Sequence, residues 1–419
     1  MRSTSSFTLV ELLITITLIG IMAATVVLVI NPAQLLAQGR DVRRIGDLGS
    51  INQAVASYIY QGPGATGLGS PNVVYVSLPD PTLTGSQTST CSSLNLPALP
   101  TGWTYNCVSQ QDLFNTNGTG WMPVNLSRIP GGSPISALPV DPTNSPTGGE
   151  YYTYATNGAN YELTAYFESN KYQATAASDG GVDPTTYEVG NNLALTPFLH
   201  GLVGYWNFNN AALGVGAVTN DNSGWANNGV LEDATSTGTG PTYTTSGCLS
   251  GGCYSFDGSD DYINTSNTLA FTNFTGMAWV YLSAAPSGTY GIFVSNPSNP
   301  NGTGFRYRIE STGDVWLLMA SSSYAILRTN NDIVPVGQWF FITVVGNSGS
   351  SMSIYLNGSL VASQSTNQTI ATPTSASLIG TSWSPSQENF NGLIDNISVY
   401  NIALSPTQVQ AIYNAEKPQ

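Results

Sequence analysis

The chain has 419 residues, of which only 8% are charged, and its formal net charge is −14 at pH 7. Beyond residue 47 there are 21 acidic and six basic residues, and such a surface repels phosphate backbones, which excludes nucleic acid as a partner. The length predicts two or three domains, and 44 glycines and 22 tyrosines among so few charges are typical of β-rich extracellular modules.

Residues 7–30 form an apolar run whose single charge is Glu11. A helix of this length measures about 36 Å, which is enough to cross a bilayer. A carboxylate inside hydrocarbon costs at least a few kcal/mol, so it persists only where something pairs with it. Residues 1–6 are too short for a secretory signal peptide. We therefore expect residues 1–6 to be a leader that is removed, while the apolar segment stays.

This arrangement resembles the N-terminus of type IV pilins and of type II secretion pseudopilins. The resemblance implies that a prepilin peptidase on the cytoplasmic face cuts between Ser6 and Phe7 and methylates the new amine, although the family usually has glycine in place of Ser6. It also implies that Glu11 of one subunit pairs with the ammonium group on Phe7 of the next, which compensates the buried charge on assembly. A plain single-helix anchor is the alternative, and such an anchor has no use for Glu11.

We expect this helix to continue to residue 61, with a kink at Asn31-Pro32 because proline lacks a backbone donor. Beyond the kink, apolar residues recur at spacings that indicate an amphipathic helix. They are Leu35, Leu36, Val42, Ile45, Leu48, Ile51, Val55 and Ile59. On the opposite face Arg43 or Arg44 can pair with Asp47, and an exposed pair of this kind is worth less than about 1 kcal/mol.

Residues 62–192 are predicted to form a small β-head. Two strand-like runs, 151–156 and 160–167, flank Asn157-Gly158, which predicts a tight hairpin. With the Leu-Pro-Val-Asp-Pro stretch at 138–142, this region resembles the heads of pilin-type proteins, and related pseudopilin heads hold calcium near such a loop. The resemblance makes Asp141 a candidate calcium ligand, and the alternative is that its side chain caps a turn.

The four cysteines fall in two close pairs, Cys91 with Cys107 and Cys248 with Cys253. Because the body of the chain is expected outside the membrane, we predict disulfides. Three connectivities are possible, and local pairing is favoured because each bond would then lie within one module. Four buried free thiols are the alternative.

A short linker, residues 193–200, precedes a run of strands with turns about every ten positions, which indicates a β-sandwich over residues 201–417. Six ordered segments resemble a laminin-G-like, concanavalin A-type jelly roll. They are Leu202–Phe208, Asp221–Leu231, Tyr254–Ile263, Gly337–Val345, Ile354–Val361 and Gly392–Tyr400. A capping box at Ser405, Pro406 and Gln408 predicts a final short helix. The fold class is thus α+β, followed by an all-β module.

An enzymatic role is not expected. The one histidine, His200, lies in the linker, and nothing orients it for a serine–histidine mechanism. Glycanases of the jelly-roll fold use closely spaced acids on one strand, whereas Asp260 and Asp261 are adjacent and should point to opposite faces. The cysteines also lack the spacing of a zinc site.

The jelly roll has candidate calcium ligands. Calcium takes six to eight oxygen ligands, and Asp221, Asp257 and Asp395 could supply carboxylates, with Asn209 and Asn228 as further donors. Similar modules often hold one structural calcium ion where an early loop meets the last strand. The alternative is that these side chains cap turns.

Aromatic residues of the sandwich fall into two groups. Trp225, Tyr324 and Trp383 are candidate stacking faces for sugar rings, with packing at the core or rim as the alternative. Trp206, Trp279 and Trp339 lie in alternating apolar strands and are expected in the core.

These features predict a filament subunit of the type IV pilus or pseudopilus kind that displays a glycan- or surface-binding module. Its partners would be other pilin subunits, the prepilin peptidase and an inner-membrane assembly platform. The subunit would first cross the membrane once with its N-terminus in the cytoplasm and then enter an extracellular filament. A type II secretion pseudopilin acting in export, and a surface lectin anchored by one helix, are the alternatives.

Overall fold

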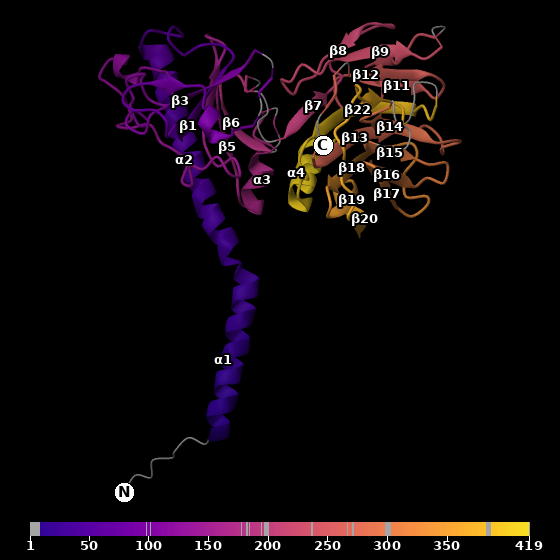
Figure 1. Ribbon diagram of the computed structural model, residues 1–419, viewed down its shortest axis with the longest axis horizontal. Coiled ribbons are helices and arrows are strands. Elements are labelled where there is room, and N and C mark those ends of the chain that lie inside the picture. Colours follow the sequence, from indigo (N-terminus) through magenta and orange to yellow (C-terminus); the bar gives the residue numbers. More distant parts are fainter. Residues whose placement is uncertain are drawn as a thin grey trace.

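The computed structural model describes residues 9–418 except 98, 101, 177, 182, 184, 194, 197–200, 236–237, 266, 270–271, 298–302 and 383–386, and of residues 20–30 it describes only the backbone. Ser6, Phe7, His200 and Trp383 therefore lie outside the described residues. A long helical stalk leads to two β-rich parts that lie side by side (Figure 1). The predicted fold class, a long helix with a β-head followed by an all-β sandwich, is confirmed.

The stalk consists of two helices, α1 (Leu9–Ile30) and α2 (Pro32–Gln61). The sequence predicts one kinked helix, but the structure breaks it at Asn31. This residue has left-handed backbone angles (φ 43°), and its side chain accepts a hydrogen bond from the amide of Gln34, so it starts a new helix with Pro32 in the first turn. Within the described part of the chain, no helix has the length and apolar character that a membrane crossing requires.

The C-terminal half of α2 packs into the head. Leu48, Ile51 and Val55 of the predicted stripe are completely buried, in a core that includes Trp121 and Tyr154. Toward the start of the helix the stripe is exposed instead, with Leu35, Leu36 and Val42 more than half accessible. The apolar stripe is therefore buried in the head core only from about the middle of α2 onward.

The head is built on one sheet of order β2-β3-β1-β4-β5-β6. Its elements are β1 (Val73–Pro79), β2 (Thr88–Ser89), β3 (Thr104–Val108), β4 (Thr153–Thr156), β5 (Tyr161–Tyr166), α3 (Asn170–Ala176) and β6 (Thr186–Gly190), with one-turn helices at Ser92–Leu94 and Leu126–Arg128. The β1–β3 pair is parallel, and the other pairs are antiparallel. The predicted hairpin forms between β4 and β5, with Gly158 in the left-handed region (φ 87°) that its turn requires.

The sandwich consists of two antiparallel sheets. The first has the order β10 (Thr242–Thr244), β11 (Cys253–Asp257), β22 (Asn391–Tyr400), β13 (Phe274–Tyr281), β18 (Trp339–Asn347), β19 (Ser351–Leu356) and β20 (Ser359–Ser365), and β7 (Leu202–Trp206) also pairs with β22. The second has the order β17 (Tyr324–Arg328), β16 (Val315–Ala320), β15 (Gly304–Ile309), β14 (Tyr290–Val294), β21 (Leu378–Ile379), β12 (Asp261–Asn264), β9 (Gly229–Asp233) and β8 (Val218–Thr219).

The predicted final helix is present as α4 (Pro406–Glu416), with the complete capping box of Ser405 and Gln408. It covers the outer face of the first sheet, so β13 is buried on both sides. Ala278 and Val280 point into the main core between the sheets, whereas Trp279 points into a second core beneath α4. Helix α4 also packs against α3 of the head (Figure 1).

Candidate functional site

The start of α1 presents apolar side chains on all sides. Every large apolar residue described here is at least half exposed: Leu9, Val10, Leu12, Leu13, Ile14, Ile16, Leu18 and Ile19. Because consecutive residues such as Leu12, Leu13 and Ile14 point in different directions around a helix, the whole circumference is apolar. Glu11 lies in the first turn of this helix. Such a surface is unfavourable in water and requires an apolar environment around it.

A buried ion network attaches α2 to the head. Arg44 is inaccessible, and its Nε and Nη2 donate to the two carboxylate oxygens of Asp141 at 2.6 and 2.9 Å. The same guanidinium contacts Asp41 Oδ1 at 2.8 Å and Glu168 Oε1 at 2.6 Å. Burial lowers the pKa of Arg44, but the hydrogen bonds and charges of these carboxylates outweigh it and raise the pKa overall. Arg40 adds a second cation to Glu168.

This network corrects one sequence-based expectation, the pairing of Arg44 with Asp47, and agrees with the alternative given for Asp141, that it caps a turn. Arg44 does not share an exposed pair with Asp47; only Arg43 does, at 3.5 Å. Asp141 uses its oxygens for Arg44 and for the amides of Thr143 and Asn144, so it caps a turn and holds an arginine. Among the described residues it belongs to no group that could hold a metal.

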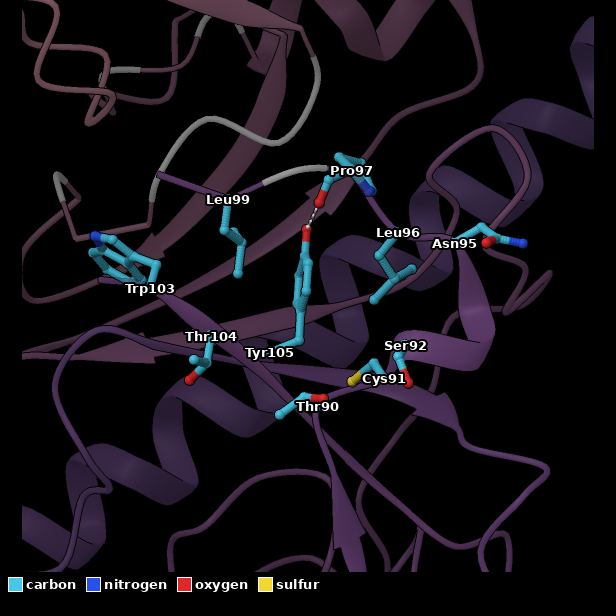
Figure 2. Close-up of a pocket in the computed structure, with 10 residues that line it drawn as sticks. All are labelled: Thr90, Cys91, Ser92, Asn95, Leu96, Pro97, Leu99, Trp103, Thr104 and Tyr105. Carbon is cyan, nitrogen blue, oxygen red and sulfur yellow. Dashed lines mark hydrogen bonds between the residues drawn. The ribbon is translucent and has the colours of Figure 1, made fainter. Parts of the chain in front are cut away.

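Both disulfides have the local pairing that was favoured. Beside Cys91–Cys107 lies a cavity of about 360 Å³, and Figure 2 shows the side chains that line it. Tyr105 spans it and donates its hydroxyl to the carbonyl of Pro97 at 2.9 Å. The lining residues are Thr90, Cys91, Ser92, Asn95, Leu96, Pro97, Leu99, Trp103, Thr104 and Tyr105. None is charged, so the cavity suits neutral groups. Sequence reasoning missed this cavity. The feature that could have indicated it is the presence of two aromatic residues, Trp103 and Tyr105, inside the loop closed by the disulfide.

Removing the Cys91–Cys107 bond by serine substitution should lower the free energy of unfolding by about 3 kcal/mol, because the unfolded chain regains the freedom of its loop. The loop between Cys248 and Cys253 is much shorter, with a separation of 5 against 16 residues, so its removal should cost less and serves as the matched control. Urea denaturation of both double variants measures the difference. An equal loss in the two would contradict the loop-length argument.

The three candidate calcium ligands of the sandwich do not come together. The carboxylate of Asp221 is occupied by backbone donors, since it accepts from the amides of Ser223 and Asn227 in its own loop and of Tyr205 on β7. Asp395 is inaccessible on β22. In the described part of the chain Asp257 instead shares a group with Asp260 and Asp261, whose ligand atoms lie within 4.8 Å of one another.

The expectation that Asp260 and Asp261 point apart is wrong. Strand β12 begins at Asp261, so Asp260 belongs to the preceding turn and its carboxylate is free to approach the same point. Burial, together with the charges of its acidic neighbours Asp257, Asp260 and Asp233, raises the pKa of Asp261 to about 6. Calcium in the sandwich stays a prediction.

The candidate stacking residues differ in access. Tyr324 is 57% exposed at the start of β17, whereas Trp225 is partly buried against the main core, and Trp383 lies outside the described residues. Of the three tryptophans expected in the core, Trp206 and Trp279 are buried, and Trp339 is only partly buried.

Sequence reasoning missed an aromatic–arginine stack on the same outward face as Tyr324. The β16–β17 register pairs Ala320 with Tyr324 and Trp316 with Arg328, which places them all on this face. The guanidinium carbon of Arg308 lies 3.7 Å from the centre of the Trp316 ring. Arg308 is itself paired with Glu310 and Glu388. The Trp316 ring is therefore covered, and among the described residues Tyr324 is the aromatic residue of this face that stays accessible.

Comparison with known families gives two matches. A model of the prokaryotic N-terminal methylation motif matches residues 1–27, and a model of the concanavalin A-like lectin/glucanases superfamily matches residues 257–410. The chain joins a methylation motif to a concanavalin A-like domain. Comparison with curated proteins finds no match.

Solved structures with a similar fold include domain 4 of the extracellular GH43 arabinanase AbnA from Geobacillus stearothermophilus, in complex with arabinotriose. It is 21% identical, with a TM-score of 0.40, and the match covers 51% of this chain and 98% of that domain. The botulinum neurotoxin serotype D binding domain is 19% identical, with a TM-score of 0.39, and the match covers 51% of this chain but only 52% of that one. The receptor-binding domain of botulinum neurotoxin G is 16% identical, with a TM-score of 0.38, and the match covers 51% of each chain.

Two acidic side chains meet at α4 of the concanavalin A-like domain: Asp395, which is inaccessible on β22, and Glu416, which is partly buried at the end of α4. Glu416 Oε2 accepts a hydrogen bond from Trp279 Nε1 at 2.9 Å, and Asp395 lies close enough for its charge to act on Glu416. Burial raises the pKa of both carboxyl groups to about 7. Tyr205 and Tyr400 face the same core, and burial raises the pKa of each. The charges of Glu416 and Asp395 add to this effect at Tyr205, and those of Asp183 and Glu416 add to it at Tyr400.

These raised pKa values predict that the domain loses stability as the pH rises. The folded chain binds protons that the unfolded chain releases near pH 4, so the two acids favour folding at pH 5 and cease to do so as the pH passes about 7. The melting temperature should therefore be higher at pH 5 than at pH 8. Asp395→Asn should flatten this dependence, whereas Glu232→Gln, on β9, should leave it unchanged. A dependence unaltered in Asp395→Asn would contradict the assignment.

Proposed function

We propose that this protein is the subunit of a type IV pilus or pseudopilus-like filament and that it displays a non-enzymatic, glycan-binding concanavalin A-like domain. One observation carries the proposal. The methylation motif at residues 1–27 includes most of α1, whose described large apolar side chains are exposed on every side. A filament core made of such helices is the environment that this surface fits.

The size of the apolar surface supports an apolar surrounding for α1, in the bilayer or in the filament. Fully burying one large apolar side chain is worth about 1.5–3 kcal/mol, so covering the eight exposed ones on α1 is worth on the order of 10 kcal/mol. Before assembly the bilayer would cover the helix, and in the filament other subunits would replace the lipid. The prepilin peptidase and an inner-membrane platform are the further partners that such a subunit needs.

Composition and the exposed aromatic residue support a neutral sugar as the ligand of the displayed domain. The net charge of −14 disfavours polyanionic ligands. Tyr324 offers a free ring, and the apolar C–H face of a sugar stacks well on such a ring. Two competing functions remain: a surface lectin anchored by one helix, and a secretion pseudopilin. The anchored lectin would not polymerise, whereas the pseudopilin would.

The test combines two measurements on cells that produce the chain. Mass spectrometry of the exported protein should find an N-methylated Phe7 as the first residue. Electron microscopy of material sheared from the cells should find filaments that carry the protein. An intact Met1 together with an absence of filaments would overturn the proposal and favour the anchored lectin.

The full chain in detergent should bind neutral oligosaccharides on a glycan array through its displayed domain, without releasing reducing sugar. Tyr324→Ala should weaken binding roughly fivefold to tenfold, which corresponds to about 1–1.4 kcal/mol for one aromatic stack. Trp383→Ala tests the second candidate ring in the same way. Tyr60→Ala is the matched control, because Tyr60 is 88% exposed on α2 and far from the sandwich sheets in sequence. Binding that is unchanged in both sandwich variants would favour a protein ligand, and sugar release would contradict the non-enzymatic role.

A further inference from the structure

The cavity beside the Cys91–Cys107 bond has an apolar floor and a polar rim (Figure 2). Its volume of about 360 Å³ lies within the range of small-molecule sites in proteins. The floor consists of partly buried side chains that pack against the cluster around the disulfide: Leu96, Leu99, Trp103 and Tyr105. The rim consists of exposed polar side chains: Thr90, Ser92, Asn95 and Thr104.

The lining is electrically neutral. None of the described lining residues carries a charge, so an ionised ligand would lose water without gaining a partner of opposite charge. The net charge of −14 adds a long-range repulsion of anions. Burial, together with the neighbouring Tyr151, raises the pKa of Tyr105, so its hydroxyl keeps its proton at neutral pH. The cavity therefore favours an uncharged ligand.

The polar groups of the rim are available to a ligand. Within the described part of the chain, the side chains of Thr90, Ser92, Asn95 and Thr104 form no hydrogen bond. A hydroxyl group both donates and accepts, and the asparagine amide offers donors and an acceptor. Such a set matches a ligand whose own groups also do both, as the hydroxyls of a sugar do.

A buried hydroxyl near the cavity also lacks a partner. Tyr151 is 1% exposed, and among the described residues its hydroxyl forms no hydrogen bond of ordinary geometry. It lies close enough to the hydroxyl of Tyr105 to affect its pKa. Buried polar groups are rarely left without a partner, and a ligand hydroxyl that reaches the tip of Tyr105 would supply one.

The cavity is held in shape before any ligand binds. Cys91, 2% exposed, is bonded to Cys107 of β3, and Tyr105 lies on the same strand, where it pairs with Val74 of β1. The Tyr105 hydroxyl donates to the carbonyl of Pro97 and so ties the middle of the loop to β3. A ligand then pays little for ordering the protein, which favours affinity.

We propose that this cavity of the head binds one neutral sugar unit, with the apolar face of its ring on the floor and its hydroxyls at the rim. Aromatic side chains such as Trp103 and Tyr105 suit the C–H face of a sugar ring. A wholly apolar compound would match the floor but leave the rim unused. The site lies apart from the sandwich, to which the proposed function assigns sugar binding, and does not depend on that assignment.

The test observes the cavity itself, in the full chain in detergent with every tryptophan replaced by fluorotryptophan. The fluorine NMR signal of Trp103 is the one that is missing from Trp103→Phe. Titration with the methyl glycosides of glucose, galactose, mannose and N-acetylglucosamine should shift this signal saturably for at least one of them, and glucuronate should not shift it. A sugar bound by the sandwich alone would leave the Trp103 signal unmoved, so the two sites are read separately.

A single sugar unit makes few contacts, so its binding is expected to be weak and to escape a washed glycan array, whereas NMR detects it. Thr104→Val keeps the shape of the side chain but removes one rim hydroxyl, and it should weaken the affinity for the glycoside roughly fivefold. Thr147→Val, at an exposed threonine of the head outside the cavity, should leave the affinity unchanged and is the matched control.

A Trp103 signal that none of the four glycosides shifts would overturn the proposal. A signal that indole shifts but the glycosides do not would identify an apolar pocket and would overturn it equally. Equal affinities in Thr104→Val and Thr147→Val would contradict the role of the rim. If Trp103→Phe does not fold, Thr104→Val identifies the signal, because a change in the adjacent residue displaces it.

Discussion

Replacing Glu11 with glutamine should reduce the amount of subunit in sheared filaments at least tenfold, while the amount in the membrane fraction stays the same. Neutral glutamine is easier to bury than glutamate, so insertion is not impaired. In the filament, however, the ammonium group on Phe7 of the neighbouring subunit would lose its partner. An unpaired charge in an apolar core costs several kcal/mol. Each loss of about 1.4 kcal/mol in the free energy of assembly lowers incorporation tenfold.

Immunoblots of the sheared and membrane fractions measure the two pools. Glu150→Gln, in the head, is the control for removing a carboxylate outside the apolar helix, and it should assemble normally. Normal incorporation of Glu11→Gln would contradict the filament proposal and favour a plain membrane anchor.

Replacing Arg44 with methionine should lower the free energy of unfolding of the head by about 3–5 kcal/mol, because Asp41, Asp141 and Glu168 would then lie as buried acids without their central cation. Methionine fills a similar volume, so the loss reports charge and not a cavity. Urea denaturation followed by tryptophan fluorescence measures it, since Trp121 lies in the same core as α2.

Arg43→Met is the matched control for that experiment. The Arg43 side chain is 63% exposed and contacts Asp47 at 3.5 Å, so its loss should cost less than about 1 kcal/mol. Equal effects of the two substitutions would mean that the buried network contributes no more than a surface pair.

Features governed by neighbouring residues were predictable from the sequence. The hairpin at Asn157-Gly158, the capping box at Ser405 and the two local disulfides depend on contacts within a few to about 16 residues. The jelly roll was recognisable because its strands follow a fixed order of motifs. The helix break at Asn31 was placed correctly, but a left-handed residue interrupts the helix completely where a kink was expected.

The parts that could not be predicted depend on distant contacts. Arg44 and Asp141 are 97 residues apart, and nothing in the local pattern of α2 distinguishes the buried Arg44 from the exposed Arg43. In the head, the pairing of the buried acids Glu162 and Glu188 depends on the register between β5 and β6. The stacking of Arg308 on Trp316 depends on the register between β15 and β16. Asp221 and Asp395 were plausible calcium ligands by residue type. The fold, however, does not bring their carboxylates together at one site.

The interruption at Asn31 has a mechanical consequence. Force applied to a displayed domain passes through the head and α2 before it reaches α1, and between the two helices it crosses a single residue outside either helix. Pro32 has no amide hydrogen with which to bridge that point, so the junction can swivel at little energetic cost while the helices on both sides stay intact. A cell pulling on a bound surface would thus reorient the heads along the line of tension before any packed core had to yield.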